Sequence, residues 1–140
     1  MGIDPTLRSA VSNLDILVVE DDPEVQEGLS VLLERCGASV TCASSAAEAL
    51  DLVSGGVSYD VMISDLEMPE HDGLWLMNEL KRKGRQEAAP AHWAILLTGS
   101  ARDAIEETAA DAGFDLCLRK PISANSLLGA IARREGIQPR

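Results

Sequence analysis

The chain has 140 residues, which is the size of a single domain. Apolar residues make up 46% of it and charged residues 25%, so it can bury a core and does not have the composition of a disordered protein. The 12 basic and 23 acidic residues leave a formal net charge of −11, which disfavours direct binding to a nucleic acid. We therefore expect cations, or the basic surfaces of other proteins, as partners.

The three cysteines cannot all pair in disulfides, which favours free thiols in a reducing compartment. No run reaches the roughly 18 apolar residues of a membrane span, and the N-terminus lacks the basic and then apolar pattern of a signal peptide. These observations predict a cytoplasmic domain that makes no membrane contact. Residues 1–13 show no clear periodicity, and we interpret them as an N-terminal linker or an expression remnant outside the fold.

The first predicted strand and helix come directly after this N-terminal segment. Residues 16–19, Ile-Leu-Val-Val, form an unbroken apolar run that stops at acidic residues, as expected for a strand buried on both faces of a sheet. Asp22 can cap the next helix, Pro23 suits its first turn, and Gly37 is a plausible stop. The apolar residues between them recur at helical spacing, so a helix is predicted here.

The strand and helix unit then recurs four times, with residues 84–90 predicted as a loop. The further predicted strands and helices are 38–43 and 45–54, 59–64 and 73–83, 93–97 and 101–112, and 115–118 and 123–134. This strict alternation predicts an α/β domain with parallel strands and helices on both faces. Such a sheet binds its ligands at the carboxyl ends of the strands.

Acidic residues gather at these strand ends. Asp65 directly follows the apolar run of the third strand, whereas Asp60 precedes it and belongs to the opposite edge. If the first and third strands are neighbours, Glu20 and Asp21 lie close to Asp65, and like charges disfavour one another's ionised forms. A hard divalent cation, Mg²⁺ or Mn²⁺, would relieve that repulsion, and a set of oxygen ligands suits it.

A hydroxyl and an ammonium group belong to the same edge. Thr98 follows the fourth strand, with the small residues Gly99 and Ser100 behind it, and Lys120 follows the fifth. A carboxylate beside a metal, a lysine and a hydroxyl is equipped for phosphoryl transfer, because the carboxylate is the nucleophile and the cations neutralise the phosphoryl oxygens. Asp65 is the predicted nucleophile, and the two small residues leave space for the incoming group.

Four motifs stand in order at these ends: VVEDDP over residues 18–23, SDLEMP over 64–69 with Asp72-Gly73, Thr98-Gly99, and Lys120-Pro121. In this combination the chain resembles the response-regulator receiver domains of two-component signalling. The resemblance implies a flavodoxin-like five-stranded parallel sheet in the order 2-1-3-4-5, flanked by five helices. The receiver would span residues 14–135, and 136–140 would be a C-terminal tail.

The same resemblance implies roles for single residues. Asp65 accepts a phosphoryl group from a phosphohistidine, Thr98 and Lys120 contact that group, and the Lys120-Pro121 bond is cis. Glu20, Asp21, Asp65 and the backbone carbonyl of Glu67 hold the Mg²⁺ ion, and no organic cofactor is expected. The partner that supplies the phosphoryl group is a histidine kinase or a histidine phosphotransfer protein. Such a domain is not a conventional enzyme, although it assists its own phosphorylation and dephosphorylation.

The sequence departs from the family pattern at the switch. Receivers commonly carry Tyr or Phe three residues before the lysine, where this chain has Cys117. Coupling would then run through backbone shifts of the fourth strand and helix, or be weak. Glu67 and Ser100, together with Gly99, resemble positions that tune the phosphate lifetime.

The surface for a downstream partner is expected over the fourth helix, the fifth strand and the fifth helix. Arg102, Arg119 and Arg133 lie in or beside these three predicted elements.

Several alternatives stay open. The stretch from residue 112 to 121 looks like receivers of hybrid sensor histidine kinases, so we expect an origin in such a kinase, with a stand-alone regulator as the alternative. A haloacid-dehalogenase-type phosphatase also uses an aspartyl nucleophile with Mg²⁺, but it needs a second Asp where this chain has Glu67. A degenerate receiver that only docks partners would bind no Mg²⁺ and accept no phosphoryl group.

Overall fold

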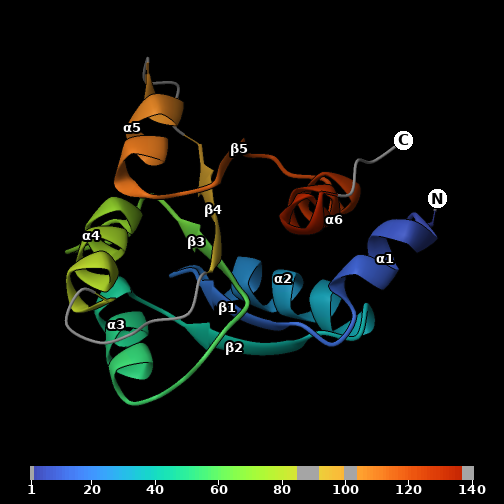
Figure 1. The fold of residues 1–140 in the computed structure, drawn as a ribbon, viewed down its shortest axis with the longest axis horizontal. Helices are drawn as coiled ribbons and strands as arrows, with labels where there is room; N and C mark the ends of the chain where they lie inside the picture. Colours follow the sequence, from blue (N-terminus) through green and yellow to red (C-terminus); the bar gives the residue numbers. More distant parts are fainter. Residues whose placement is uncertain (1, 85–91, 100–103, 137–140) are drawn as a thin grey trace.

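A computed structural model of the chain describes residues 2–84, 92–99 and 104–136. Five parallel strands form one sheet in the order β2-β1-β3-β4-β5, as the resemblance implied (Figure 1). The strands are β1 (Asp15–Val19), β2 (Ser39–Ala43), β3 (Val61–Asp65), β4 (Trp93–Thr98) and β5 (Leu116–Arg119). The observed bounds differ from the predicted ones by one or two residues, which is the usual uncertainty at element ends.

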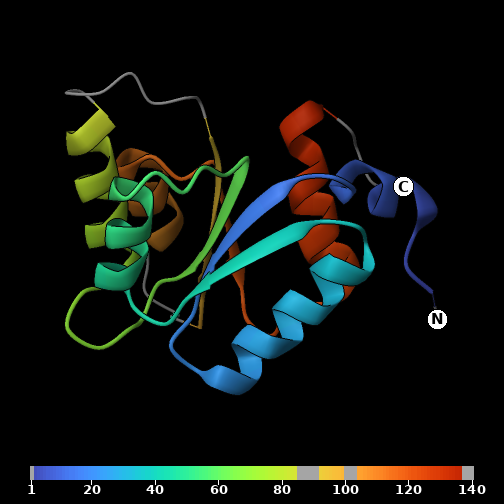
Figure 2. The same cartoon turned by 90° about the horizontal axis from the view of Figure 1, so that it is seen from below.

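Helices cover both faces of the sheet. They are α1 (Pro5–Val11), α2 (Pro23–Arg35), α3 (Ala46–Ser54), α4 (Gly73–Gly84), α5 (Ile105–Ala112) and α6 (Ala124–Ala132), followed by the short 3-10 helix η1 (Arg133–Glu135). The helices α1, α2 and α6 share one apolar cluster with the sheet, and α3, α4 and α5 share the other. Figure 2 shows these two groups on opposite sides of the strands.

Burial along the strands explains the apolar runs in the sequence. The central strands β1, β3 and β4 are buried at nearly every position, because helices cover both of their faces. The edge strands β2 and β5 are only partly buried. Asp22 caps α2 as predicted, since its carboxylate accepts hydrogen bonds from the backbone N–H groups of Glu24 and Val25.

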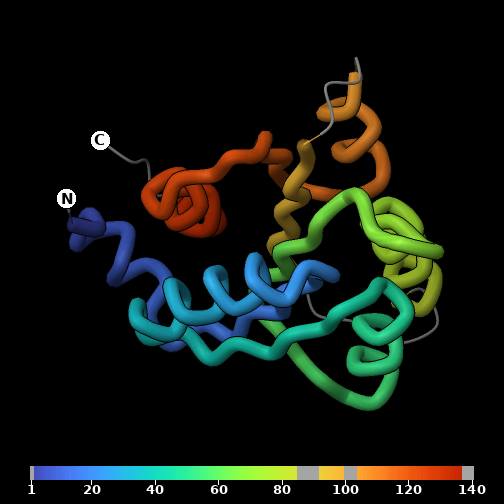
Figure 3. Tube along the Cα trace, turned by 180° about the vertical axis from the view of Figure 1, so that it is seen from behind, coloured from blue at the N-terminus to red at the C-terminus, as the bar shows by residue number. Residues whose placement is uncertain are grey.

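The N-terminal segment corrects the sequence analysis, which placed residues 1–13 outside the fold and expected five helices. Residues 5–11 form a sixth helix, α1, whose Leu7 and Val11 are fully buried in the core cluster beside α6. Figure 3 shows α1 and α6 next to each other. Two buried side chains four residues apart are too short a pattern to reveal a helix by periodicity.

Two other predicted segments fall partly outside the described residues. The predicted loop 84–90 begins at Gly84, which ends α4, and its remaining residues are not among those described. The fourth predicted helix was expected from residue 101, and its described part begins at Ile105. Within the described ranges, no helix is both long enough and apolar enough to cross a membrane.

Candidate functional site

The parallel sheet brings the strand ends of the predicted site to one edge. Glu20 and Asp21 follow β1, Asp65 is the last residue of β3, Thr98 is the last residue of β4, and Lys120 follows β5. Because β1 and β3 are hydrogen-bonded neighbours in the sheet, Val19 pairs with Ser64, and the acidic residues that follow them face the same space. The structure therefore assembles the predicted residues from four separate segments.

Three carboxylates form the centre of this edge. Oxygen atoms of Glu20, Asp21 and Asp65 all lie within 4.8 Å of one another. Glu20 and Asp65 are only 2% and 5% exposed, whereas Asp21 is exposed to solvent. Burial raises the pKa of the Asp65 carboxyl above its ordinary value, and the charge of Asp21 raises it further. Burial also raises the pKa of Glu20, to which the charges of Asp65 and Asp21 contribute.

Lys120 provides the positive charge opposite these acids. Its Nζ lies 3.1 Å from Oδ1 of Asp65 and 3.5 Å from Oε2 of Glu20. Partial burial by itself lowers the pKa of Lys120, but the hydrogen bond to Asp65 and the charges of Asp65 and Glu20 outweigh it, so the pKa is raised. The Lys120-Pro121 peptide bond is cis, as the resemblance implied.

Thr98 and Glu67 meet beside the acidic centre. Thr98 is fully buried at the end of β4, and its hydroxyl donates a hydrogen bond to Oε1 of Glu67, 3.2 Å away. The backbone of Glu67 also hydrogen-bonds to the Asp65 carboxylate and lowers its pKa. The contact between the two side chains could not be predicted from the sequence, because it depends on how the segment after β3 folds back beside β4. The expected metal-ligand role of the Glu67 carbonyl stays a prediction.

Two residues without an assigned role shape the edge. The side-chain amide of Gln26 donates hydrogen bonds to the carbonyls of Glu20 and Ala43, which ties α2 to the ends of β1 and β2. Gly73 begins α4 so close to β3 that a Cβ there would lie 2.7 Å from the backbone oxygen of Asp65. The sequence signal for Gly73 was its place in the Asp72-Gly73 motif. No pattern in the sequence pointed to Gln26.

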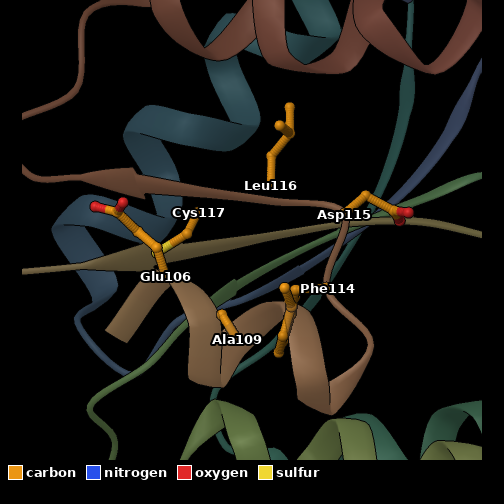
Figure 4. A pocket seen from close by; sticks show the side chains of 7 residues that line it. Glu106, Ala109, Phe114, Asp115, Leu116 and Cys117 are labelled. Carbon is orange, nitrogen blue, oxygen red and sulfur yellow. The ribbon is translucent and has the colours of Figure 1, made fainter. Parts of the chain in front are cut away.

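The predicted switch position, Cys117, lies in β5 and lines a cavity of about 230 Å³ between α5 and β5. Figure 4 shows its side chain beside Glu106, with Phe114 and Asp115 farther along the same cavity. Burial, together with the charge of Glu106, raises the pKa of the Cys117 thiol. Its surroundings therefore favour the neutral thiol over a reactive thiolate. Gly99 is exposed directly after β4, and Ser100 lies outside the described residues.

Of the three arginines in or beside the expected partner surface, the structure describes Arg119 and Arg133. Arg119 ends β5 at the site edge and forms an ion pair with Glu106 of α5 at 3.3 Å. Arg133 lies beyond the far end of α6, near the start of β4, as the hydrogen bond from Trp93 Nε1 to the carbonyl of Ala130 shows. Arg102 lies outside the described residues. The expected partner surface stays a prediction.

Known proteins are similar to this chain in sequence. The response regulator receiver domain family matches residues 16–132. An uncharacterized 14.6 kDa protein of Leptolyngbya boryana is 37% identical over 118 residues, which cover 84% of this chain and 87% of that protein. The transcriptional regulatory protein PmrA of Pectobacterium parmentieri is 35% identical over 116 residues, which cover 81% of this chain and 49% of PmrA. The chain thus spans about half the length of that regulator.

Solved structures agree with the sequence relatives. A response regulator receiver domain protein from Clostridium thermocellum superposes with a TM-score of 0.75 at 31% identity, covering 86% of this chain and 92% of that one. The family match includes all the strand ends described above, from Glu20 to Lys120. By sequence and by fold, the chain belongs to the family of response regulator receiver domains of two-component signalling.

Proposed function

We propose that this chain is a phosphorylation-operated switch, in which Asp65 accepts a phosphoryl group from a phosphohistidine of a partner protein. The observation that carries this proposal is the ion pair between Lys120 and the buried Asp65 carboxylate, at 3.1 Å, inside a cluster that holds two further acids. A buried carboxylate held by a single ammonium group, at the end of a central strand, suits a nucleophile whose position must be fixed.

The transfer step needs no other protein group as a reactant. A carboxylate oxygen of Asp65 attacks phosphorus as the bond from phosphorus to the histidine nitrogen breaks, and that electron pair stays on the imidazole. The product is an aspartyl phosphate, whose added charge lies beside Lys120. Lys120 then stabilises the phosphoryl oxygens as it stabilises the free carboxylate now, and the hydroxyl of Thr98 can donate to the same group.

The donor set fits a hard divalent cation, for which we propose Mg²⁺ or Mn²⁺. Three carboxylates face one lysine, so the site carries an excess of negative charge that burial makes costly, as the raised pKa values of Glu20 and Asp65 show. Glu20, Asp21, Asp65 and the Glu67 carbonyl would hold the ion. When bound, it would neutralise charge on the phosphoryl oxygens.

The donor partner is proposed to be a histidine kinase or a histidine phosphotransfer protein. Its histidine must reach Asp65 at the carboxyl edge, so its surface must cover the segments that border this edge. One of them is the first turn of α2, where Val25 is a large apolar side chain with 38% of its surface exposed. An exposed apolar residue beside an acidic centre suits a partner surface that is apolar with a basic rim.

Phosphorylation is proposed to change the surface formed by α5, β5 and α6. Thr98 at the end of β4 would turn toward the phosphoryl group, and β4 is hydrogen-bonded to β5. Because Cys117 stands in place of an aromatic ring, we propose that the change passes through backbone shifts of β4 and α5. Glu67, Gly99 and Ser100 are proposed to adjust the lifetime of the phosphate. An origin in a hybrid histidine kinase stays a prediction.

Intact-mass spectrometry tests the chemistry directly. We expect incubation with Mg²⁺ and acetyl phosphate to add one phosphoryl group to the wild-type chain. Asp65→Asn should add none, because the amide is not a nucleophile. The matched control is Asp60→Asn, at the opposite end of the sheet, which should still be phosphorylated.

Two results would contradict the proposal. Phosphorylation that persists in Asp65→Asn would mean that another residue is the acceptor. No addition to the wild-type chain, either from acetyl phosphate or from a phosphorylated histidine kinase, would indicate a domain that only docks partners. Steady release of phosphate from a phosphate ester would instead support the phosphatase alternative, which the family match disfavours.

A further inference from the structure

The hydrogen bond between Thr98 and Glu67 lies at the point where the switch must move. The segment after β3 is fixed beside β4 by a backbone hydrogen bond of 2.8 Å from Leu66 to the carbonyl of Leu97. This places the carboxylate of Glu67, an exposed residue, 3.2 Å from the buried hydroxyl of Thr98. The contact therefore joins the loop next to the phosphoacceptor to the strand that responds to it.

A threonine hydroxyl carries one proton and can donate it to one acceptor at a time. In the present structure, the Glu67 carboxylate takes that proton. A phosphoryl group on Asp65 would need the same proton from Thr98. The bond to Glu67 and the bond to the phosphoryl group are therefore alternatives, and forming the second requires breaking the first.

We propose that Glu67 is a positioning residue that holds Thr98 in the unphosphorylated arrangement and so opposes the switch. This inference rests on the proposed function, because it assumes that a phosphoryl group on Asp65 engages Thr98. It goes further in giving the Glu67 side chain a defined action. Removal of the carboxylate should make the phosphorylated arrangement easier to reach.

Simple charge repulsion would also make Glu67 oppose a phosphoryl group, so the two effects must be separated. Glu67→Ala removes both the charge and the hydrogen-bond acceptor. Glu67→Gln removes the charge but keeps an oxygen that can accept from Thr98. Thr98→Val removes the donor and keeps nearly the same side-chain volume. A double-mutant cycle over Glu67 and Thr98 therefore isolates the hydrogen bond from the charge.

The first readout is the affinity for beryllofluoride in the presence of Mg²⁺, measured by titration calorimetry. Beryllofluoride serves as the probe because it imitates a phosphoryl group on a carboxylate. We expect Glu67→Ala to tighten binding about three- to tenfold more in the Thr98 background than in Thr98→Val, given the usual contribution of one hydrogen bond. An equal effect in both backgrounds would mean that only charge acts, and would overturn the proposal.

The second readout needs neither metal nor beryllofluoride. The side-chain rotamer of Thr98 can be followed by NMR through the scalar couplings of its γ-methyl carbon. We expect one rotamer in the wild-type chain and in Glu67→Gln, and averaging between rotamers in Glu67→Ala. A Thr98 rotamer that stays unchanged in Glu67→Ala would contradict the proposed restraint.

The two measurements also separate this proposal from the function on which it rests. If the wild-type chain takes neither beryllofluoride nor a phosphoryl group, the proposed function is wrong, whatever the rotamers show. If the wild-type chain binds beryllofluoride but the cycle shows no coupling, the function stands and the role of Glu67 is wrong.

Discussion

The strands begin at one edge of the sheet, the amino edge, and end at the opposite one, the carboxyl edge. Acidic residues play opposite parts at these two edges. At the amino edge, single carboxylates accept backbone hydrogen bonds: Asp60 accepts from the N–H of Asp15, and Asp115 from the N–H of Ala94, both at 2.8 Å. At the carboxyl edge, Glu20, Asp21 and Asp65 crowd one another around a single lysine. In the first arrangement, the carboxylates satisfy backbone N–H groups. In the second, the carboxylates repel one another, and a bound ligand can relieve that repulsion.

This difference shows why an acidic residue at a strand end does not by itself indicate a functional site. Asp60 precedes β3 and accepts a backbone hydrogen bond, whereas Asp65 ends β3, where burial and the charge of Asp21 raise the pKa of its carboxyl. A perturbed carboxylate with an identified charged neighbour is typical of functional sites. The neighbours of the residue, rather than its type, distinguish the two edges, and the following predictions test this distinction.

The largest effect is expected from loss of α1, the helix that packs on the core beside α6. Deletion of residues 2–13 removes α1, whose Leu7 and Val11 are fully buried. Burial of two such side chains contributes about 3–6 kcal/mol, and the cost of ordering the segment offsets part of it. We therefore expect the free energy of unfolding in urea to fall by about 2–4 kcal/mol. An unchanged unfolding midpoint would restore the interpretation of this segment as a linker.

Tyr59 should make the amino edge sensitive to alkaline pH. It is buried before β3 and stacks on His92 with ring centroids 4.3 Å apart, and burial raises its pKa to about 12. A raised pKa gives stability that is full below the ordinary pKa near 10 and is lost as the pH rises through 12. The loss should reach about 2–3 kcal/mol, at 1.36 kcal/mol per pKa unit.

The control for this effect is Tyr59→Phe, which keeps the ring and removes the ionisable hydroxyl. The difference between the two proteins should grow as the pH rises from 10 to 12, when unfolding is followed by circular dichroism. Parallel losses in both proteins would assign the alkaline effect to other groups.

Paired substitutions on β3 compare the two edges directly. Asp60→Ala should lower the free energy of unfolding by about 0.5–1.5 kcal/mol, because the Asp15 N–H loses its acceptor. Asp65→Asn should instead raise it at neutral pH without metal, because the ionised form of Asp65 is disfavoured in the folded state. Since the pKa is raised, this gain should disappear as the pH falls and Asp65 becomes protonated. A loss of stability in Asp65→Asn at pH 7 would contradict the account of the carboxyl edge.

A further prediction concerns stabilisation of the carboxyl edge by Mg²⁺. At a concentration ten times the dissociation constant, binding to the folded state alone adds about 1.4 kcal/mol. Thermal unfolding with and without Mg²⁺ should show this shift in the wild-type chain and in Asp60→Asn. The shift should be much smaller in Asp65→Asn, which removes one ligand charge. An equal shift in all three proteins would place the ion elsewhere.

The sequence alone determined the fold class and which residues gather at the carboxyl edge, whereas the chemical roles of these residues stay predictions. Unbroken apolar runs such as residues 16–19 arise because both faces of a central strand are covered, and this is visible along the chain. The polar residues that follow such runs, including Asp65 and Thr98, then had to lie at one edge, because parallel strands end on the same side. Neither conclusion required knowledge of side-chain contacts.

The tertiary structure decided what depends on distances between separate segments. The helix α1 has only two fully buried residues, so its membership in the core depends on α6 rather than on its own pattern. The contact of Glu67 with Thr98 depends on the register of β3 and β4, and the separation of Arg119 from Arg133 depends on the direction of α6. The local sequence shows the periodicity of each element and the positions where strands end. Contacts between residues of separate segments form only when the chain folds.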